Sequence, residues 1–199
     1  MKKFKLTSEF IVDISGVKLF RIKALIEFGN VKAGDLGGYI EKEENLSHMG
    51  DAWVSDDARI SGNAQVFGNA QVFGDAQVFG DAWVFGNARV SGNAQVFGDA
   101  QVSGNARVFG NARVFGNARV FGDARVSGDK DYAYAHGFGS CNRTTTFFRL
   151  KDGDVGVRCG CFYGTLAQFR DKVCETHGET KKAQEYLMLA DLMEIRFKN

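Results

Sequence analysis

The 199-residue chain contains no proline, although it contains 25 glycines and 18 phenylalanines. A disordered glycine-rich segment normally carries proline and serine and few aromatic residues, because it has little apolar surface to bury. Eighteen phenylalanine side chains, by contrast, need burial or a contact. The composition therefore excludes a flexible linker and predicts a folded chain.

The chain also lacks an excess of charge and a long apolar run. Its 25 basic and 24 acidic residues give a net charge of +1, so no overall field draws it to extended nucleic acid or to an anionic membrane. No stretch approaches the ~18 apolar residues of a membrane span, and the start, Met1 to Phe4, is not followed by a signal-peptide core. We expect a cytoplasmic protein with neither a membrane nor extended nucleic acid as partner.

Cysteine is absent from the first two thirds of the chain. The four cysteines are Cys141, Cys159, Cys161 and Cys174, and this clustering suits reduced thiols better than a disulfide framework. With His177, the last three form the only arrangement that resembles a metal site. Its spacing matches no common zinc finger, and such cysteines usually pack in a core. We assign no metal site and no cofactor, and zinc binding stays open.

Thirteen consecutive six-residue repeats run from Asp51 to Gly128 with the pattern Asn/Asp-Ala-x-Val-Phe/Ser-Gly. Only Asp56, in place of Gly, and Ile60, in place of Val, break it. Ala-x-Val-Phe has the length of a short strand, in which alternate side chains face opposite sides. Gly-Asn/Asp supplies a corner, since both residues tolerate tight turns. Ala and Val are constant while x varies, so we expect Ala and Val inside, and x and Phe outside.

These hexads resemble the hexapeptide-repeat, left-handed β-helix family, in which an aliphatic residue and a small residue four positions later point inward. The resemblance implies three hexads per coil, hence a triangular parallel β-solenoid with about 18 residues per coil and a left-handed winding. Residues 51–128 would form just over four coils. The alternative, an up-and-down sheet of hairpins, needs strands too short to hold a core. The handedness rests on the resemblance alone.

An uncapped solenoid would expose open backbone edges and polymerise, so the flanks should close it. We predict a mainly β fold with three parts: an N-terminal β cap at residues 1–44, the solenoid at 45–128 and a small C-terminal α+β cap at 129–199. Residues 45–50 read as a degenerate leading hexad. Two short motifs, at residues 32–39 and 159–166, look like those of uncharacterised phage or prophage β-solenoid proteins.

Both caps carry recognisable elements. Residues 9–25 predict a β-hairpin with its turn at Ser15-Gly16, and residues 144–159 predict a second hairpin. Thr165 and Gln168 form a capping box for a helix that ends near Gly178. Thr180 can cap a second helix. The apolar stripe of that helix consists of Ala183, Tyr186, Leu187, Ala190 and Met193.

Residues eighteen apart should stack and form three outer faces. The first face carries Ser61, Phe79, Phe97 and Phe115; the second carries Phe67, Phe85, Ser103 and Phe121; the third carries Ser55, Phe73, Ser91, Phe109 and Ser127. The stacked rings could simply stiffen the solenoid. A ladder of three rings is nevertheless a large apolar patch for a soluble protein, which favours an interface. The predicted binding residues are Phe79, Phe97, Phe115 and Arg113, with Trp83 and Arg119 on the second face.

Catalytic motifs are missing from the repeats. Many hexapeptide-repeat proteins are acyltransferases that use a histidine base in a cleft between subunits, yet the thirteen hexads contain no histidine and no insertion. His48 precedes them and His136 follows them. No Walker loop, no dinucleotide fingerprint and no paired carboxylates at catalytic spacing occur.

We therefore predict a non-enzymatic β-solenoid binding module that associates with a protein, or with itself as a homo-oligomer, through a Phe-bearing face. The phage-like resemblance implies a role in a bacterial host, such as interference with a defence protein or its nucleotide signal, so a nucleotide is a further candidate partner. The alternative is an acyl- or glycosyl-type transferase with His48 or His136 at an oligomer cleft. A filament-forming scaffold is disfavoured because both ends look capped.

Overall fold

Thirteen two-residue strands follow one another at six-residue intervals in the computed structural model, which describes residues 2–140 and 143–198. Each strand consists of the variable residue and the Val or Ile that follows it. The strands are β4 (Trp53–Val54), β5 (Arg59–Ile60), β6 (Gln65–Val66), β7 (Gln71–Val72), β8 (Gln77–Val78), β9 (Trp83–Val84), β10 (Arg89–Val90), β11 (Gln95–Val96), β12 (Gln101–Val102), β13 (Arg107–Val108), β14 (Arg113–Val114), β15 (Arg119–Val120) and β16 (Arg125–Val126).

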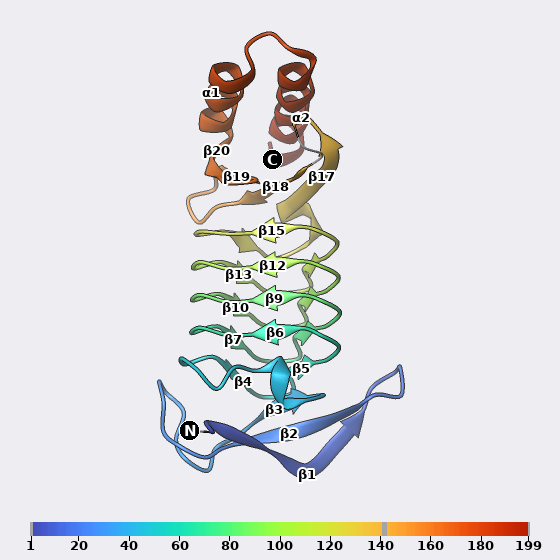
Figure 1. The fold of residues 1–199 in the computed structure, drawn as a ribbon, viewed down its shortest axis with the longest axis vertical. Coiled ribbons are helices and arrows are strands. Elements are labelled where there is room, and N and C mark those ends of the chain that lie inside the picture. The colour runs from blue at the N-terminus through green and yellow to red at the C-terminus, as the bar shows by residue number, and fades with distance from the viewer. Residues whose placement is uncertain (1, 141–142, 199) are drawn as a thin grey trace.

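Every one of these strands pairs in parallel with the strand three repeats away. Val96 of β11, for example, lies between Val78 of β8 and Val114 of β14. The strands thus form three ladders along a prism (Figure 1): β5-β8-β11-β14 on the first face, β6-β9-β12-β15 on the second and β4-β7-β10-β13-β16 on the third. The prediction of a parallel β-solenoid with 18 residues per coil is confirmed.

The interior contains the two constant side chains of each hexad. All Ala and Val residues of the repeats, and Ile60, have no exposed surface, which confirms the predicted facing. Corners need a left-handed backbone: Gly98 has φ +68°, and a Cβ there would lie 3.1 Å from the backbone N of Gly116. Asp56, which replaces a corner Gly, also adopts a positive φ of +55°. Its carboxylate accepts the N–H of Gly74 at 3.0 Å.

One further coil begins before the regular hexads and ends in the first of them. Ile40 of β3 (Leu36–Ile40) pairs with Ile60, Leu46 forms a bridge to Val66, and Val54 completes the turn. The solenoid therefore has about five coils. Residues 45–50 do not follow the hexad register, because Leu46 takes the inward place opposite Val66. His48 consequently lies outside the core.

The N-terminal cap is built on an antiparallel hairpin of β1 (Phe4–Val12) and β2 (Lys18–Ala24), as predicted. The Asp13 carboxylate closes its turn by accepting the N–H groups of Ser15 and Val17. Strand β2 pairs with β3, so the first-face ladder extends into a seven-stranded sheet ordered β1-β2-β3-β5-β8-β11-β14. A short 3-10 helix, η1 (Glu43–Asn45), follows β3.

Two buried polar side chains close the carbonyl edge of the first coils. The ammonium of Lys3, a residue only 1% exposed, donates to the carbonyls of Ala52 (2.7 Å) and Gly50 (3.2 Å). The amide of Asn45 donates to the carbonyls of Gly62 and Ala64. Burial lowers the pKa of Lys3 to about 8, although the charge of nearby Asp51 acts in the opposite direction.

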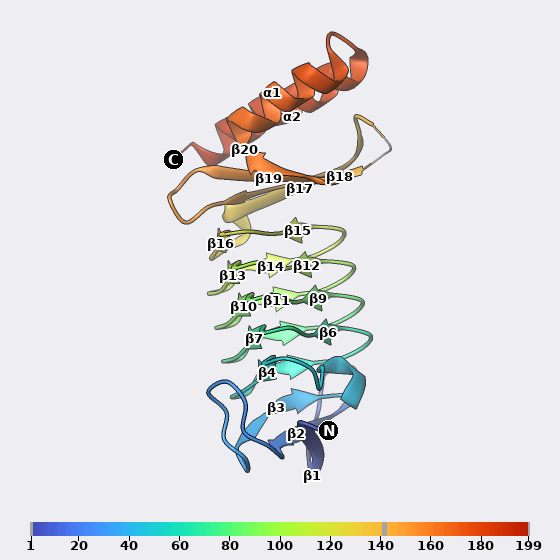
Figure 2. The same cartoon turned by 60° about the vertical axis from the view of Figure 1, so that its left-hand side comes forward.

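The C-terminal cap is a four-stranded antiparallel sheet covered by two helices. A 3-10 helix, η2 (Asp129–Asp131), leads into β17 (Tyr132–Phe138), β18 (Arg143–Arg149), β19 (Val155–Cys159) and β20 (Phe162–Thr165), and then α1 (Leu166–His177) and α2 (Lys181–Phe197). Figure 2 shows the sheet between the last coil and the helices. The predicted hairpin and both helix caps are confirmed, and the predicted stripe of α2 is buried except for Leu187, which is half-buried; β17 and β20 were not predicted.

Side chains from this cap also satisfy the open N–H edge of the last coil. Asp129 accepts from the backbone of Arg113 (3.0 Å), Thr146 from that of Arg119 (2.9 Å) and Asp131 from that of Ser127 (2.9 Å). A free coil edge is a template for pairing with another chain. Both ends of the solenoid are therefore closed by hydrogen bonds from the caps.

None of the helices within the described ranges is both long enough and apolar enough to cross a membrane.

Candidate functional site

The first face carries an uninterrupted aromatic ladder. Phe79 and Phe97 stack with ring centroids 4.9 Å apart, and Phe97 and Phe115 stack at 5.3 Å, with interplanar angles of 2° and 12°. The guanidinium of Arg113 lies 5.7 Å from the Phe97 ring. The rings remain accessible, and Phe115 is 39% exposed. We call these three residues the first-face ladder; the structure brings them and Arg113 together as expected.

The upper end of the ladder touches the C-terminal cap. Phe115 meets the edges of Tyr132 and Tyr134 at 6.4 and 6.0 Å. Burial raises the pKa of the Tyr132 hydroxyl, in keeping with a packed ring. Phe115 therefore contributes to cap packing, whereas Phe79 and Phe97 do not touch the C-terminal sheet.

Neither of the other faces has a comparable strip. On the second face Phe67 and Phe85 stack at 4.9 Å, but Ser103 ends the series, and Phe121 lies beneath Tyr163 (5.0 Å) and the guanidinium of Arg158 (5.1 Å). The third face alternates Ser and Phe. The first face thus combines the longest run of stacked rings with the seven-stranded sheet.

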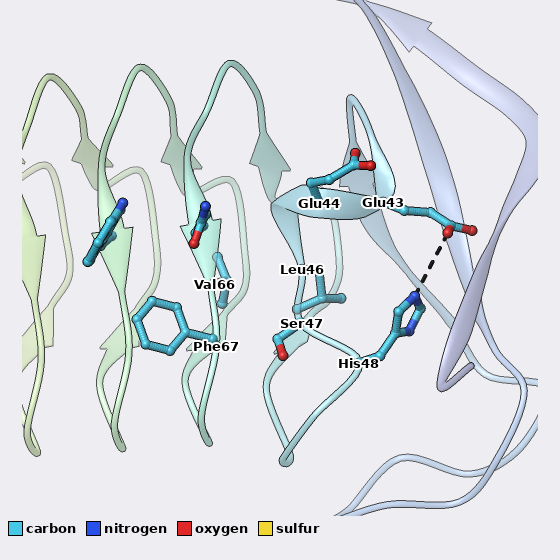
Figure 3. A pocket seen from close by; sticks show the side chains of 9 residues that line it. Glu43, Glu44, Leu46, Ser47, His48, Val66 and Phe67 are labelled. Carbon is cyan, nitrogen blue, oxygen red and sulfur yellow. Dashed lines mark ion pairs between the residues drawn. The ribbon is translucent and has the colours of Figure 1, made fainter. Parts of the chain in front are cut away.

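The second face instead has a hollow at each end. The N-terminal groove, of about 620 Å³, lies between η1, the chain that follows it and strands β6 and β9. Trp83, 41% exposed, lines it, with its ring edge-on to Phe67 at 6.1 Å. Figure 3 shows Phe67 on the solenoid side of this groove and His48 on the cap side, turned toward Glu43.

Both ring nitrogens of His48 face structural neighbours. Nδ1 accepts the backbone N–H of Lys3 at 3.2 Å, the ring stacks on Phe4 at 4.4 Å, and Nε2 lies 3.9 Å from the carboxylate of Glu43. With Nδ1 as the acceptor, the neutral ring carries its proton on Nε2 and has no lone pair left for a substrate. This arrangement disfavours His48 as a general base.

The C-terminal hollow of the second face, which we call the arginine pocket, has a volume of about 540 Å³. It is lined by Asp99, Gln101, Asn117 and Arg119 of the solenoid and by His136, Arg143, Thr144 and Gly160 of the cap. His136 Nδ1 and Thr144 Oγ1 are 3.0 Å apart. The pocket thus lies between the solenoid, which contributes the predicted binding residue Arg119, and the β17–β18 hairpin of the cap.

The predicted binding residues are thus split between two surfaces. Phe79, Phe97, Phe115 and Arg113 share the first face, whereas Trp83 and Arg119 lie two coils apart on the second. His48 and His136 belong to hollows at opposite ends of that face and do not meet. Arg143 was not anticipated, because no sequence signal reveals which solenoid face the β17–β18 hairpin lies beside.

The cysteine cluster is only partly assembled. Cys159, Cys161 and His177 line a small hollow of about 330 Å³ beside Tyr186, whereas Cys174 is exposed elsewhere on α1. Cys159 Sγ accepts a hydrogen bond from Thr145 at 3.2 Å. Among the described residues no group of three or more His, Cys, Asp or Glu side chains is placed to hold a metal ion. Cys141 lies outside the described residues.

A family model described as the YdcK β-solenoid repeat matches residues 52–72, 82–98, 100–114 and 112–128. All four segments lie within the hexad array, and none includes a cap. The chain is a solenoid repeat protein, in agreement with its coils. No curated protein matches the chain.

Proposed function

We propose that this chain is a non-enzymatic binding module whose first face associates with a protein surface. The observation that carries the proposal is the first-face ladder, in which three stacked rings and the Arg113 guanidinium lie side by side on one face of the sheet. Interface hot spots are enriched in aromatic residues and Arg, and a preformed rigid surface loses little conformational entropy on binding.

The closed ends of the solenoid support lateral rather than end-to-end association. Lys3 and Asn45 occupy the carbonyl edge, and Asp129, Thr146 and Asp131 occupy the N–H edge. Because both backbone edges are engaged, a filament built by stacking coils is disfavoured. The outer faces of the repeats remain available for binding.

The finer parts of the proposal rest on resemblance. The hexads resemble the hexapeptide-repeat, left-handed β-helix family, and the motifs at residues 32–39 and 159–166 resemble those of phage-borne solenoid proteins. We propose on this basis that the chain works in the cytoplasm of a bacterial host, on a host protein or on a second copy of itself. The transferase alternative would have to use His136 in the arginine pocket, given the contacts that engage His48.

The test is a pair of matched double variants. Phe79→Ser with Phe97→Ser removes two stacked rings from the first face, and Phe67→Ser with Phe85→Ser removes an equally stacked pair (4.9 Å, 3°) from the second. Ser occupies equivalent positions at Ser61 and Ser91, so both variants should fold. Each is assayed by its melting temperature and by the native mass of the complex that it forms in a bacterial lysate.

We expect the wild type and the second-face variant to form a complex heavier than the 21.8 kDa chain, and the first-face variant to lose it with its melting temperature retained. Acyl-coenzyme A turnover by the purified chain would replace the proposal with the transferase. A complex that survives in the first-face variant would show that this face is not the binding surface.

A further inference from the structure

The arginine pocket has an electrostatic character that the aromatic faces lack. Two guanidiniums, Arg119 and Arg143, line it together with the imidazole of His136, against a single carboxylate, Asp99. Among the described residues neither guanidinium has an ion-pair partner, whereas Arg21, Arg149 and Arg170 do. The two guanidiniums exceed the single carboxylate by one charge, so the lining of the pocket carries a net positive charge.

One contact fixes the backbone of Arg119, and another positions the side chain of Arg143. The backbone N–H of Arg119 donates to Thr146 Oγ1 at 2.9 Å, which ties the last coil to β18 beneath the pocket. The side chain of Arg143 lies against Gly160, in the turn between β19 and β20. A Cβ at Gly160 would overlap that guanidinium, and the φ of +58° there also favours glycine. Arg119 from the solenoid and Arg143 from the cap thus line one hollow, and Arg143 also borders the hollow beside Cys159.

Neutral donors and acceptors complete the lining. The amides of Gln101 and Asn117 and the hydroxyl of Thr144 line the same hollow. Paired guanidiniums fit phosphate oxygens, because each presents several N–H donors in a fixed plane. A volume of about 540 Å³ exceeds the needs of a bare ion and lies in the usual range for small-molecule sites, roughly 300–1,000 Å³.

We propose that the arginine pocket binds a phosphorylated small molecule of about mononucleotide size, with its phosphate between Arg119 and Arg143. The amides of Gln101 and Asn117 would then contact the rest of the ligand. The hollow is bounded by the cap and by two adjacent coils, so it suits a compact ligand rather than a strand of nucleic acid. This site lies on the second face and does not depend on the protein association proposed for the first.

The test is isothermal titration calorimetry of the full chain with three probes: inorganic phosphate, adenosine monophosphate and adenosine. Arg119→Gln is the main variant, because Gln already occupies the equivalent position at Gln65 and Gln101 and the backbone bond to Thr146 is kept. Arg143→Gln removes the second guanidinium. Arg107→Gln is the control, since Arg107 is an exposed arginine at the same repeat position on the third face.

We expect adenosine monophosphate to bind at one site and adenosine not to bind. Arg119→Gln and Arg143→Gln should each weaken that binding about tenfold or more, because each removes charged hydrogen bonds, and Arg107→Gln should leave it unchanged. If inorganic phosphate binds and adenosine monophosphate does not, the phosphate group that the two arginines bind comes from free phosphate. The proposal is overturned if neither phosphate probe binds, if adenosine binds equally well, or if Arg107→Gln weakens binding as much as Arg119→Gln.

Discussion

Ala94 and Gln95 are neighbours in the chain, yet Ala94 is completely buried and Gln95 is half-exposed. Ala94 lies in a closely packed column in which Ala76 and Ala112 occupy the same place in the adjacent coils. Ala94→Leu should therefore destabilise the protein by ~1–3 kcal/mol through overpacking, and more than Gln95→Leu does. Urea unfolding of the two variants measures the difference. The reverse ranking would refute the assigned facing.

Corner asparagines form a hydrogen-bonded ladder along one edge of the prism. Asn69 donates to Asn87, Asn87 to Asn105 and Asn105 to Asp123, each at 3.2 Å. The series ends on Asp123, whose carboxylate accepts a hydrogen bond but has no N–H to donate. Such a ladder needs an amide at each interior step, because a carboxylate has no N–H to pass on.

Asn87→Asp should therefore destabilise the fold by about 0.5–1.5 kcal/mol, since its bond to Asn105 is lost. Asp123→Asn is the matched control: it keeps the acceptor for Asn105 and should have little effect. Thermal melts of the two variants provide the comparison. An equal change in both would mean that the ladder contributes nothing specific.

The facing of residues was predictable because the alternation of constant and variable positions encodes it directly. The amide ladder was not predicted, although its signal was present: Asn69, Asn87, Asn105 and Asp123 are eighteen residues apart. The corner preference for Asn or Asp explains either residue equally well. Only the stacked geometry shows why an amide is required at the interior steps.

At the scale of elements, the buried ammonium of Lys3 should make the stability contributed by the N-terminal cap depend on pH. Its pKa is about 8 in the folded chain, below its usual value of 10.5. Between these two values the unfolded chain binds more protons than the folded one, so stability should rise as the pH increases through this window. Below about pH 8 the cost of burying the charge is fully present.

The unfolding free energy should accordingly increase from pH ~8 to pH ~10 in the wild type, and Lys3→Met should flatten this rise. Lys5→Met, at an exposed neighbouring position, should keep it. The range stops near pH 10 because burial raises the pKa of Tyr132 above its usual value of 10.0. Above that pH the unfolded chain loses the hydroxyl proton while the folded chain keeps it, so the unfolding free energy falls. Equal slopes in Lys3→Met and the wild type would show that Lys3 is not the responsible group.

The elements that the sequence predicted are those whose signals are local. Thr165 and Gln168 form the expected capping box, and the hairpin at residues 144–159 has its turn at Lys151 to Asp154. Strand β17 pairs with the next strand, β18, but it escaped prediction because its sequence, Tyr-Ala-Tyr-Ala-His-Gly-Phe, has no clear turn before it. Leu46 escaped prediction because its bridge to Val66 does not follow the hexad register.

For the whole molecule, the six-residue period fixes the coil length and the three faces, and with them the first-face ladder. The period does not determine which of the three faces the strands of the caps contact. Arg119 and Arg143 are 24 positions apart, and their meeting depends on the direction in which β17 and β18 leave the last coil. The ladder could therefore be named from the sequence, while the arginine pocket could be recognised only in the folded chain.

The first face and the arginine pocket can be tested separately, since they share no residue. The central claim is that the first-face ladder becomes covered when the chain binds its protein partner. Hydroxyl-radical footprinting of the wild-type chain, free and in its native complex, measures this directly. Phe109, 38% exposed on the third face, is the internal reference for Phe115, which is 39% exposed. We predict that oxidation of Phe79, Phe97 and Phe115 falls in the complex while that of Phe109 is unchanged. Unchanged oxidation of the ladder, with Phe109 protected instead, would contradict the account.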